Sequence, residues 1–270
     1  MQGKGCSHGI FLGMTGFPRS IRYGIALVAC TALLASPLSV AHGKPTPKQP
    51  AWGGSDSPLR PGASLGGYCT FNFVFYKPGT KSSPPKAYIG TAGHCTDALD
   101  EKVSQPTLGE IGQVVYDSDL IEDDDDFFVD FSLIEIYPKF IKHTNPEVLH
   151  WGGPTRIVTE EDLAVGDRID VYGYGIGLGA TEQTRPRHGY VTNWSDDEYE
   201  ADTPTVNGDS GSPLVHHETG AAFGIISRYA MTETTPPATD KGPFVSWILE
   251  ELAKAGFNVR LATVRDYKPI

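Results

Sequence analysis

Residues 207–213 read NGDSGSP, a glycine-rich stretch centred on Ser210. A serine hydroxyl is a poor nucleophile until a base removes its proton. The glycine beside this serine allows the backbone to turn two N–H groups toward one point, where they can stabilise an oxyanion. The stretch therefore predicts a nucleophilic serine if a base lies near it in the fold; the structural alternative is a serine in an ordinary glycine-rich turn.

Two earlier segments contain the residue types that such a serine requires. Residues 91–95 (TAGHC) carry His94, and an imidazole can accept a proton near neutral pH. Residues 129–134 (VDFSLI) carry Asp130 at the start of an apolar run, where a buried carboxylate could orient the imidazole. Asp125 and Asp126 lie nearby in the sequence, but Asp130 is the preferred candidate because it starts the apolar run at residues 131–134, where a buried carboxylate would lie against the barrel.

Taken together, the three segments resemble the chymotrypsin-like (trypsin-family) serine peptidases, especially their secreted bacterial members. The order His94, Asp130, Ser210, with gaps of 36 and 80 residues, fits that family. The resemblance implies that His94 is the general base, Asp130 the orienting carboxylate and Ser210 the nucleophile. It also implies an oxyanion hole made by the backbone N–H groups of Gly208 and Ser210. The implied fold is all-β, with two antiparallel six-stranded β-barrels, the active site between them and a C-terminal α-helix.

The composition independently favours a β-rich fold. The 270 residues include 31 glycines and 21 prolines, which suit many short strands joined by turns. One helix is predicted near the end of the chain, where apolar residues recur at helical spacing between Pro243 and Gly256. Strands are predicted at residues 70–76, 87–91, 111–116, 127–137, 168–174, 190–192, 213–215 and 222–226.

The first 41 residues have the pattern of a secretory signal peptide. Basic residues and no acidic ones precede an apolar stretch at residues 25–35, and small residues at 39–41 predict cleavage after Ala41. Cys30 resembles a lipoprotein attachment site, but it lies too early in the apolar stretch for that reading. We therefore expect a secreted, extracellular protein. The predicted parts are the signal peptide (1–41), a Pro-rich linker or pro-segment (42–65), an N-terminal barrel (66–155) and a C-terminal barrel with the helix (156–270).

Two cysteines remain after the predicted cleavage, Cys69 and Cys95. An even pair in an oxidising compartment predicts one disulfide bond. The resemblance implies the same pair, because the family joins the cysteine after its histidine to one on an earlier strand.

Departures from the family pattern concern the substrate pocket. Pro204 stands where trypsin-like members have an aspartate, so no acidic pocket base and no preference for Arg or Lys are expected. Tyr229 replaces a glycine of the strand that pairs with the substrate, which favours a small or unusual side chain at P1, the residue before the cleaved bond. The predicted substrate-binding residues are Pro204, Thr205, Ser227, Arg228 and Tyr229.

The sequence does not identify a binding partner for Asp209 or for the acidic run at residues 122–126. In animal members the aspartate before the nucleophile pairs with a freed N-terminus, but no such activation sequence precedes Cys69. Asp209 therefore needs another partner, or activation differs. The acidic run at residues 122–126 could bind calcium, but its spacing lacks the alternation of a dedicated calcium loop and favours a solvated loop.

These observations predict a secreted serine endopeptidase that acts on proteins or peptides through an acyl-enzyme. We expect a monomer with no metal, cofactor or membrane span, and the net charge of −11 argues against nucleic-acid binding. A catalytically silent binding or adhesion protein on the same fold is the main alternative. An α/β-hydrolase esterase requires a histidine well after the serine, and only His216 and His217 follow Ser210.

Overall fold

The computed structural model describes residues 49–121, 129–175, 185–230 and 239–268. The predicted signal peptide and the acidic run at 122–126 lie outside these ranges. Within them, no helix has the length and apolar character that crossing a membrane requires.

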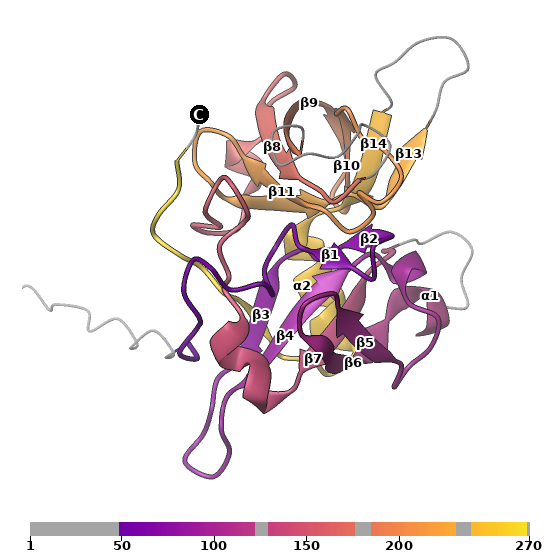
Figure 1. Cartoon of the computed structure of the whole chain (residues 1–270). Coiled ribbons are helices and arrows are strands. Elements are labelled where there is room, and N and C mark those ends of the chain that lie inside the picture. The colour runs from indigo at the N-terminus through magenta and orange to yellow at the C-terminus, as the bar shows by residue number, and fades with distance from the viewer. Residues whose placement is uncertain (1–48, 122–128, 176–184, 231–238, 269–270) are drawn as a thin grey trace, which may run out of the picture. The chain divides into compact units, whose positions relative to one another are not determined.

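The first barrel is built on an antiparallel sheet of six strands in the order β15-β3-β4-β7-β6-β5 (Figure 1). Side chains of successive strand residues alternate between the two faces of the sheet, so Val74 and Ile89 pack in one apolar cluster and Phe75 and Tyr88 in another. A separate short pair, β1 with β2, leads into it. The strands are β1 (Ser64–Leu65), β2 (Cys69–Thr70), β3 (Val74–Lys77), β4 (Lys86–Thr91), β5 (Lys102–Gln105), β6 (Gly109–Asp117), β7 (Ser132–Ile136) and β15 (Arg260–Leu261).

The second barrel is an antiparallel sheet of seven strands in the order β12-β11-β8-β9-β10-β14-β13. A bridge between Gly224 and Phe244 joins β12 to the end of β14, so six strands form the ring and β13 is attached to its edge. The predicted two-barrel fold is therefore confirmed, with this added strand. The strands are β8 (Arg168–Tyr172), β9 (Pro186–Trp194), β10 (Glu198–Asp202), β11 (Pro213–His216), β12 (Ala222–Ile225), β13 (Arg228–Ala230) and β14 (Thr239–Pro243).

The predicted C-terminal helix is α2 (Val245–Lys254). Its buried residues Val245, Ile248 and Leu252 pack in one cluster with Phe73 and Phe75 of the first barrel. The same cluster contains Val215 and Ile225 of the second barrel, so the helix packs against both barrels. The other helices are short: α1 (Ser118–Ile121) and the 3-10 turns Gly93–Cys95, Pro138–His143 and Glu160–Asp162.

The predicted domain boundaries need two corrections. Strand β15 follows α2 in the sequence yet pairs with β3, so the end of the chain belongs to the first sheet. Residues 49–65, predicted as part of a Pro-rich linker or pro-segment, pack against the first barrel, and Leu59 is fully buried in its core. The composition of residues 49–65 did not predict this packing, because the segment has few apolar side chains and many prolines.

We expect Leu59→Ala to lower the free energy of unfolding by about 2–4 kcal/mol, because it deletes a fully buried side chain and leaves a cavity. Leu99→Ala is the matched control, since Leu99 is 46% exposed and its truncation should change stability by less than about 0.5 kcal/mol. Urea denaturation of the two variants measures both values. Equal effects would show that residues 49–65 do not contribute to the core.

Candidate active site

His94 and Asp130 are brought together in the first barrel. The Nδ1 atom of His94 lies 3.0 Å from Oδ2 and 3.1 Å from Oδ1 of Asp130, and the backbone N–H of His94 donates to Oδ1 at 2.9 Å. His94 lies in the 3-10 turn Gly93–Cys95, and Asp130 precedes β7 with a φ of 43°. Such a backbone is uncommon for a non-glycine residue, and here it aims the carboxylate at the imidazole.

Gly93 leaves room for this approach. A Cβ at position 93 would lie 2.7 Å from Oδ1 of Asp119 and 3.1 Å from Oδ1 of Asp130. The glycine of the TAGHC segment therefore lets two carboxyl groups lie close to the histidine turn.

The second barrel also contributes to this carboxylate. The hydroxyl of Ser227 donates to Oδ2 of Asp130, so the fully buried carboxylate accepts hydrogen bonds from His94 and from Ser227. Burial alone would raise the pKa of Asp130, but the hydrogen bonds from His94 and Ser227 outweigh it and hold the pKa below its ordinary value. The hydrogen bond with Asp130 in turn raises the pKa of His94 above its ordinary value, against the effect of desolvation.

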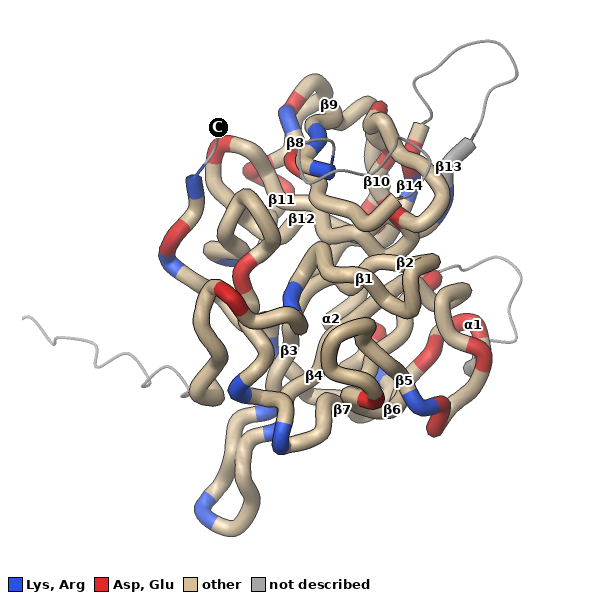
Figure 2. The backbone as a smooth tube through the Cα atoms, viewed as in Figure 1, with Lys and Arg blue, Asp and Glu red and all other residues tan. Residues whose placement is uncertain are grey.

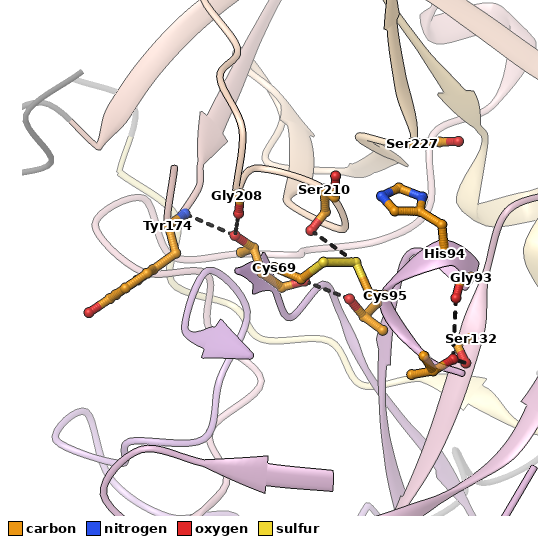
Figure 3. The surroundings of a disulfide bond; sticks show 12 residues. Cys69, Gly93, His94, Cys95, Ser132, Tyr174, Gly208, Ser210 and Ser227 are labelled. Atoms are coloured by element: carbon orange, nitrogen blue, oxygen red, sulfur yellow. Dashed lines mark hydrogen bonds between the residues drawn. A yellow bond between two sulfur atoms is a disulfide. The ribbon is translucent and has the colours of Figure 1, made fainter. Parts of the chain in front are cut away.

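Ser210 comes from the second barrel, and its backbone is fixed by the first. The N–H of Thr70 donates to the Ser210 carbonyl at 2.8 Å. The predicted disulfide between Cys69 and Cys95 is formed, and Cys95 Sγ lies 3.9 Å from the same carbonyl, a van der Waals contact because this sulfur carries no proton. In Figure 3 the Ser210 side chain and the His94 imidazole both point away from the disulfide. In the described part of the chain, the Ser210 hydroxyl makes no hydrogen bond to His94.

The backbone around Ser210 presents free amide donors. Gly208 and Gly211 have φ values of 102° and 86°, and a Cβ on Gly211 would lie 2.2 Å from the Thr70 carbonyl. Among the described residues, the N–H groups of Gly208 and Ser210 donate to no protein acceptor. The NGDSGSP stretch thus has the two unpaired donors that an oxyanion requires.

Asp209 has a partner that the sequence did not indicate. Arg187 of β9 forms a bidentate ion pair with it, with N–O distances of 2.5 and 2.6 Å. The Arg187 side chain is 8% exposed and that of Asp209 is fully buried. The backbone N–H groups of Gly175 and Val206 also donate to this carboxylate, both at 2.9 Å. Because all these donors lie within the folded chain, no freed N-terminus is needed to neutralise Asp209.

The predicted substrate-binding residues lie in two segments. Pro204 is exposed, and its carbonyl accepts a hydrogen bond from Arg187 at 2.8 Å. The Thr205 hydroxyl lies 2.8 Å from that of Thr203 and donates to the carboxyl of Asp240.

The second segment is β13 and the residue before it. The Ser227 side chain supports Asp130, and Arg228 forms an exposed ion pair with Glu198. The side chain of Tyr229 lies outside the described part of the structure, so the prediction that it narrows the pocket stays a prediction.

Two clusters have donor atoms close enough for a metal ion in the described residues, but both are otherwise engaged. One comprises His94 and the two cysteines, whose sulfurs form the disulfide. In the other, Asp170 binds His188 and His217 through their Nδ1 atoms, at 2.6 and 2.9 Å, and the Tyr267 hydroxyl at 2.9 Å. This second cluster ties the C-terminal segment to the second barrel.

Comparison with known proteins supports the fold. No protein-family model and no curated protein sequence matches the chain. Among solved structures, the chymotrypsin of Cellulomonas bogoriensis is similar, with a TM-score of 0.51 and 16% identity over 76% of this chain and 99% of that one. Protease A of Thermobifida fusca has a TM-score of 0.49 and 17% identity over 73% and 92% of the chains. A Nocardiopsis protease has a TM-score of 0.46 and 18% identity over 72% and 93%. The first of these shows that the chain has the chymotrypsin-like fold.

We expect NMR titration to place the pKa of His94 above 6.5, and Asp130→Asn to lower it, because the substitution removes the anionic partner. The neutral imidazole, which alone can act as a base, therefore predominates only above this raised pKa. A pKa of His94 that is identical in both proteins would contradict the pairing.

We also expect Arg187→Ala to lower the free energy of unfolding by about 3–5 kcal/mol, because it leaves the buried Asp209 carboxylate without its countercharge. Arg156→Ala is the matched control: its ion pair with Asp162 is 43% exposed on the arginine side, and surface pairs contribute at most about 1 kcal/mol. Denaturant unfolding at neutral pH compares the two. A loss from Arg187→Ala no larger than that of the control would contradict the buried pair.

Proposed function

We propose that the chain is a secreted serine endopeptidase that cleaves proteins or peptides through an acyl-enzyme on Ser210. The observation that carries the proposal is the hydrogen-bonded arrangement of Ser227, Asp130 and His94 beside the fixed backbone of Ser210. In this proposal, residues 1–41 direct export and the exported protein acts outside the cell as a monomer.

The proton route follows from the orientation of the imidazole. Because Nδ1 faces Asp130, the other ring nitrogen, Nε2, is left to accept the Ser210 proton. A rotation of the Ser210 side chain brings its hydroxyl to Nε2, the oxygen attacks the substrate carbonyl, and His94 then protonates the leaving amine. In the second half of the reaction, His94 takes a proton from a water molecule, which attacks the acyl ester on Ser210. The ester bond breaks, the acid product leaves, and the Ser210 oxygen regains its proton from His94. Asp130 stays ionised throughout and stabilises the imidazolium, which agrees with its lowered pKa.

Oxyanion stabilisation falls to the N–H groups of Gly208 and Ser210. Loss of one such donor typically costs about 3–4 kcal/mol of transition-state stabilisation. The Arg187–Asp209 pair holds the residue between these two donors, so it keeps the oxyanion hole formed. Since that pair is already present, the proposed enzyme does not depend on a newly freed N-terminus to form this site.

The binding or adhesion alternative is favoured by one observation, the absence of a hydrogen bond between Ser210 and His94 within the described residues. Catalytic hydrogen bonds are often long before substrate binds, so the proposed enzyme is also compatible with this geometry. A fluorophosphonate probe separates them, because it labels only an activated serine.

We expect the secreted protein to be labelled at Ser210 and to cleave a denatured protein. Ser210→Ala should abolish labelling and lower kcat/KM by at least about 1,000-fold, whereas Ser104→Ala, at an exposed strand position, should retain both. Cleavage by Ser210→Ala at the native rate would overturn the nucleophile assignment. Absence of labelling and cleavage in the native protein would favour the binding function.

A further inference from the structure

Asp170, His188 and His217 bring three metal-binding side chains together in the second barrel. Strand β8 lies between β9 and β11, so Asp170 is opposite His188 on one side and close to the end of β11, which leads to His217, on the other. One ligand atom from each residue lies within 4.8 Å of the other two. Two imidazoles and a carboxylate are ligands that Zn²⁺ binds at about 2.0–2.2 Å. The three positions are far apart in the sequence, so no short spacing could predict this cluster.

The distances within the cluster are close to those of a zinc site. The Nδ1 atoms of His188 and His217 lie 2.6 and 2.9 Å from the Asp170 carboxylate oxygens. Ligand atoms of a tetrahedral zinc ion are about 3.3 Å apart, so each imidazole has to withdraw by less than about 1 Å to admit the ion. Bonds to the metal then replace the hydrogen bonds, since a neutral imidazole that coordinates through Nδ1 carries its proton on Nε2.

The Nδ1 atom of His188 has two neighbours that require opposite proton positions. A guanidinium nitrogen of Arg168 lies 2.7 Å from it, and the Asp170 carboxylate lies 2.6 Å from it. The guanidinium can only donate and the carboxylate only accepts, so one ring nitrogen cannot serve both. A metal ion between the nitrogen and the carboxylate accepts a lone pair from each and removes the conflict. Arg168, whose side chain is 31% exposed, can turn toward solvent when such an ion binds.

The cluster is close to the surface, and its carboxylate is held in place. The side chains of His188 and His217 are 34% and 19% exposed, so an ion reaches them without a deep channel. Asp170 is fully buried and accepts a further hydrogen bond from the Tyr267 hydroxyl at 2.9 Å. Hydrogen bonds of this kind orient metal-binding carboxylates. Because Tyr267 belongs to the C-terminal segment, an ion bound to Asp170 would strengthen the attachment of that segment to the second barrel.

We propose that Asp170, His188 and His217 form a zinc site, and that Arg168 supplies the cation there when no metal is bound. The proposal replaces the expectation of a protein without a metal, and it does not depend on the proposed peptidase function. Three protein ligands leave the fourth position of a tetrahedral ion to water. The ion joins β8, β9 and the turn after β11, so its effect is to stabilise the folded protein.

The first test is calorimetric titration of the secreted protein with zinc chloride. The native protein should bind one zinc ion that His188→Gln and His217→Gln both lose. His216→Gln is the matched control and should retain the ion, because the His216 imidazole faces Asp167, at 3.7 Å, instead of Asp170. Circular dichroism establishes that each variant is folded. Saturating zinc should also raise the Tm of the native protein by at least about 5 °C, since a ligand of the folded state stabilises it.

The second test measures a gain of affinity and does not depend on a variant losing the site. Arg168→Gln removes the competing cation, so this variant should bind zinc at least about tenfold more tightly than the native protein. Arg156→Gln is the matched control, because Arg156 pairs with Asp162 away from the cluster and its loss should leave the affinity unchanged.

The outcomes decide the proposal without a measurement of peptidase activity. Native protein that binds no zinc would overturn it. Binding that both His188→Gln and His217→Gln retain would also overturn it, since the ion would then lie elsewhere in the chain. An equal affinity of Arg168→Gln and the native protein would overturn the role given to Arg168.

Discussion

The buried carboxylate of Asp130 is the group on which the arrangement of the site depends. Taking an ionised carboxylate out of water costs several kcal/mol unless strong hydrogen bonds replace the lost hydration. Here the donors come from both barrels: His94 from the first and Ser227 from the second. The Ser210 carbonyl is likewise held by Thr70 across the same boundary. The site can therefore form only when the two barrels have packed together, which makes its geometry a consequence of the whole fold.

Three aspartates near this boundary are buried to the same extent but meet different surroundings. Asp130 accepts hydrogen bonds that hold its pKa low, and Asp209 is paired with Arg187. Burial raises the pKa of Asp240 to about 8, against the effect of the hydrogen bond that it accepts from the Thr205 hydroxyl. Identical side chains thus acquire different charges at neutral pH because of the groups that face them. Figure 2 shows how widely acidic residues are spread over the chain, so composition could not single out these three.

The sequence predicted the parts of the molecule that depend on local patterns. The segments around His94, Asp130 and Ser210, the disulfide and the helix after Pro243 could all be identified from neighbouring residues. Arg187 and Asp240 could not, because their contacts depend on strand register: Arg187 lies 22 residues before Asp209, and Asp240 meets Thr205 across 35 residues. Strand β15 was missed for another reason, since a strand of two residues is too short to show alternation.

Arg187 holds two parts of the segment that leads to Ser210. One of its nitrogens contacts both the Asp209 carboxylate and the Pro204 carbonyl, and the other binds the second oxygen of Asp209. The same side chain therefore holds Asp209, between the two proposed oxyanion donors, and Pro204, at the start of the segment that leads to Ser210. Asp240, in contrast, is placed by the register of β14 between β10 and β13. Arg187 and Asp240 thus reach the segment before Ser210 from different strands, Arg187 through the Pro204 carbonyl and Asp240 through the Thr205 hydroxyl.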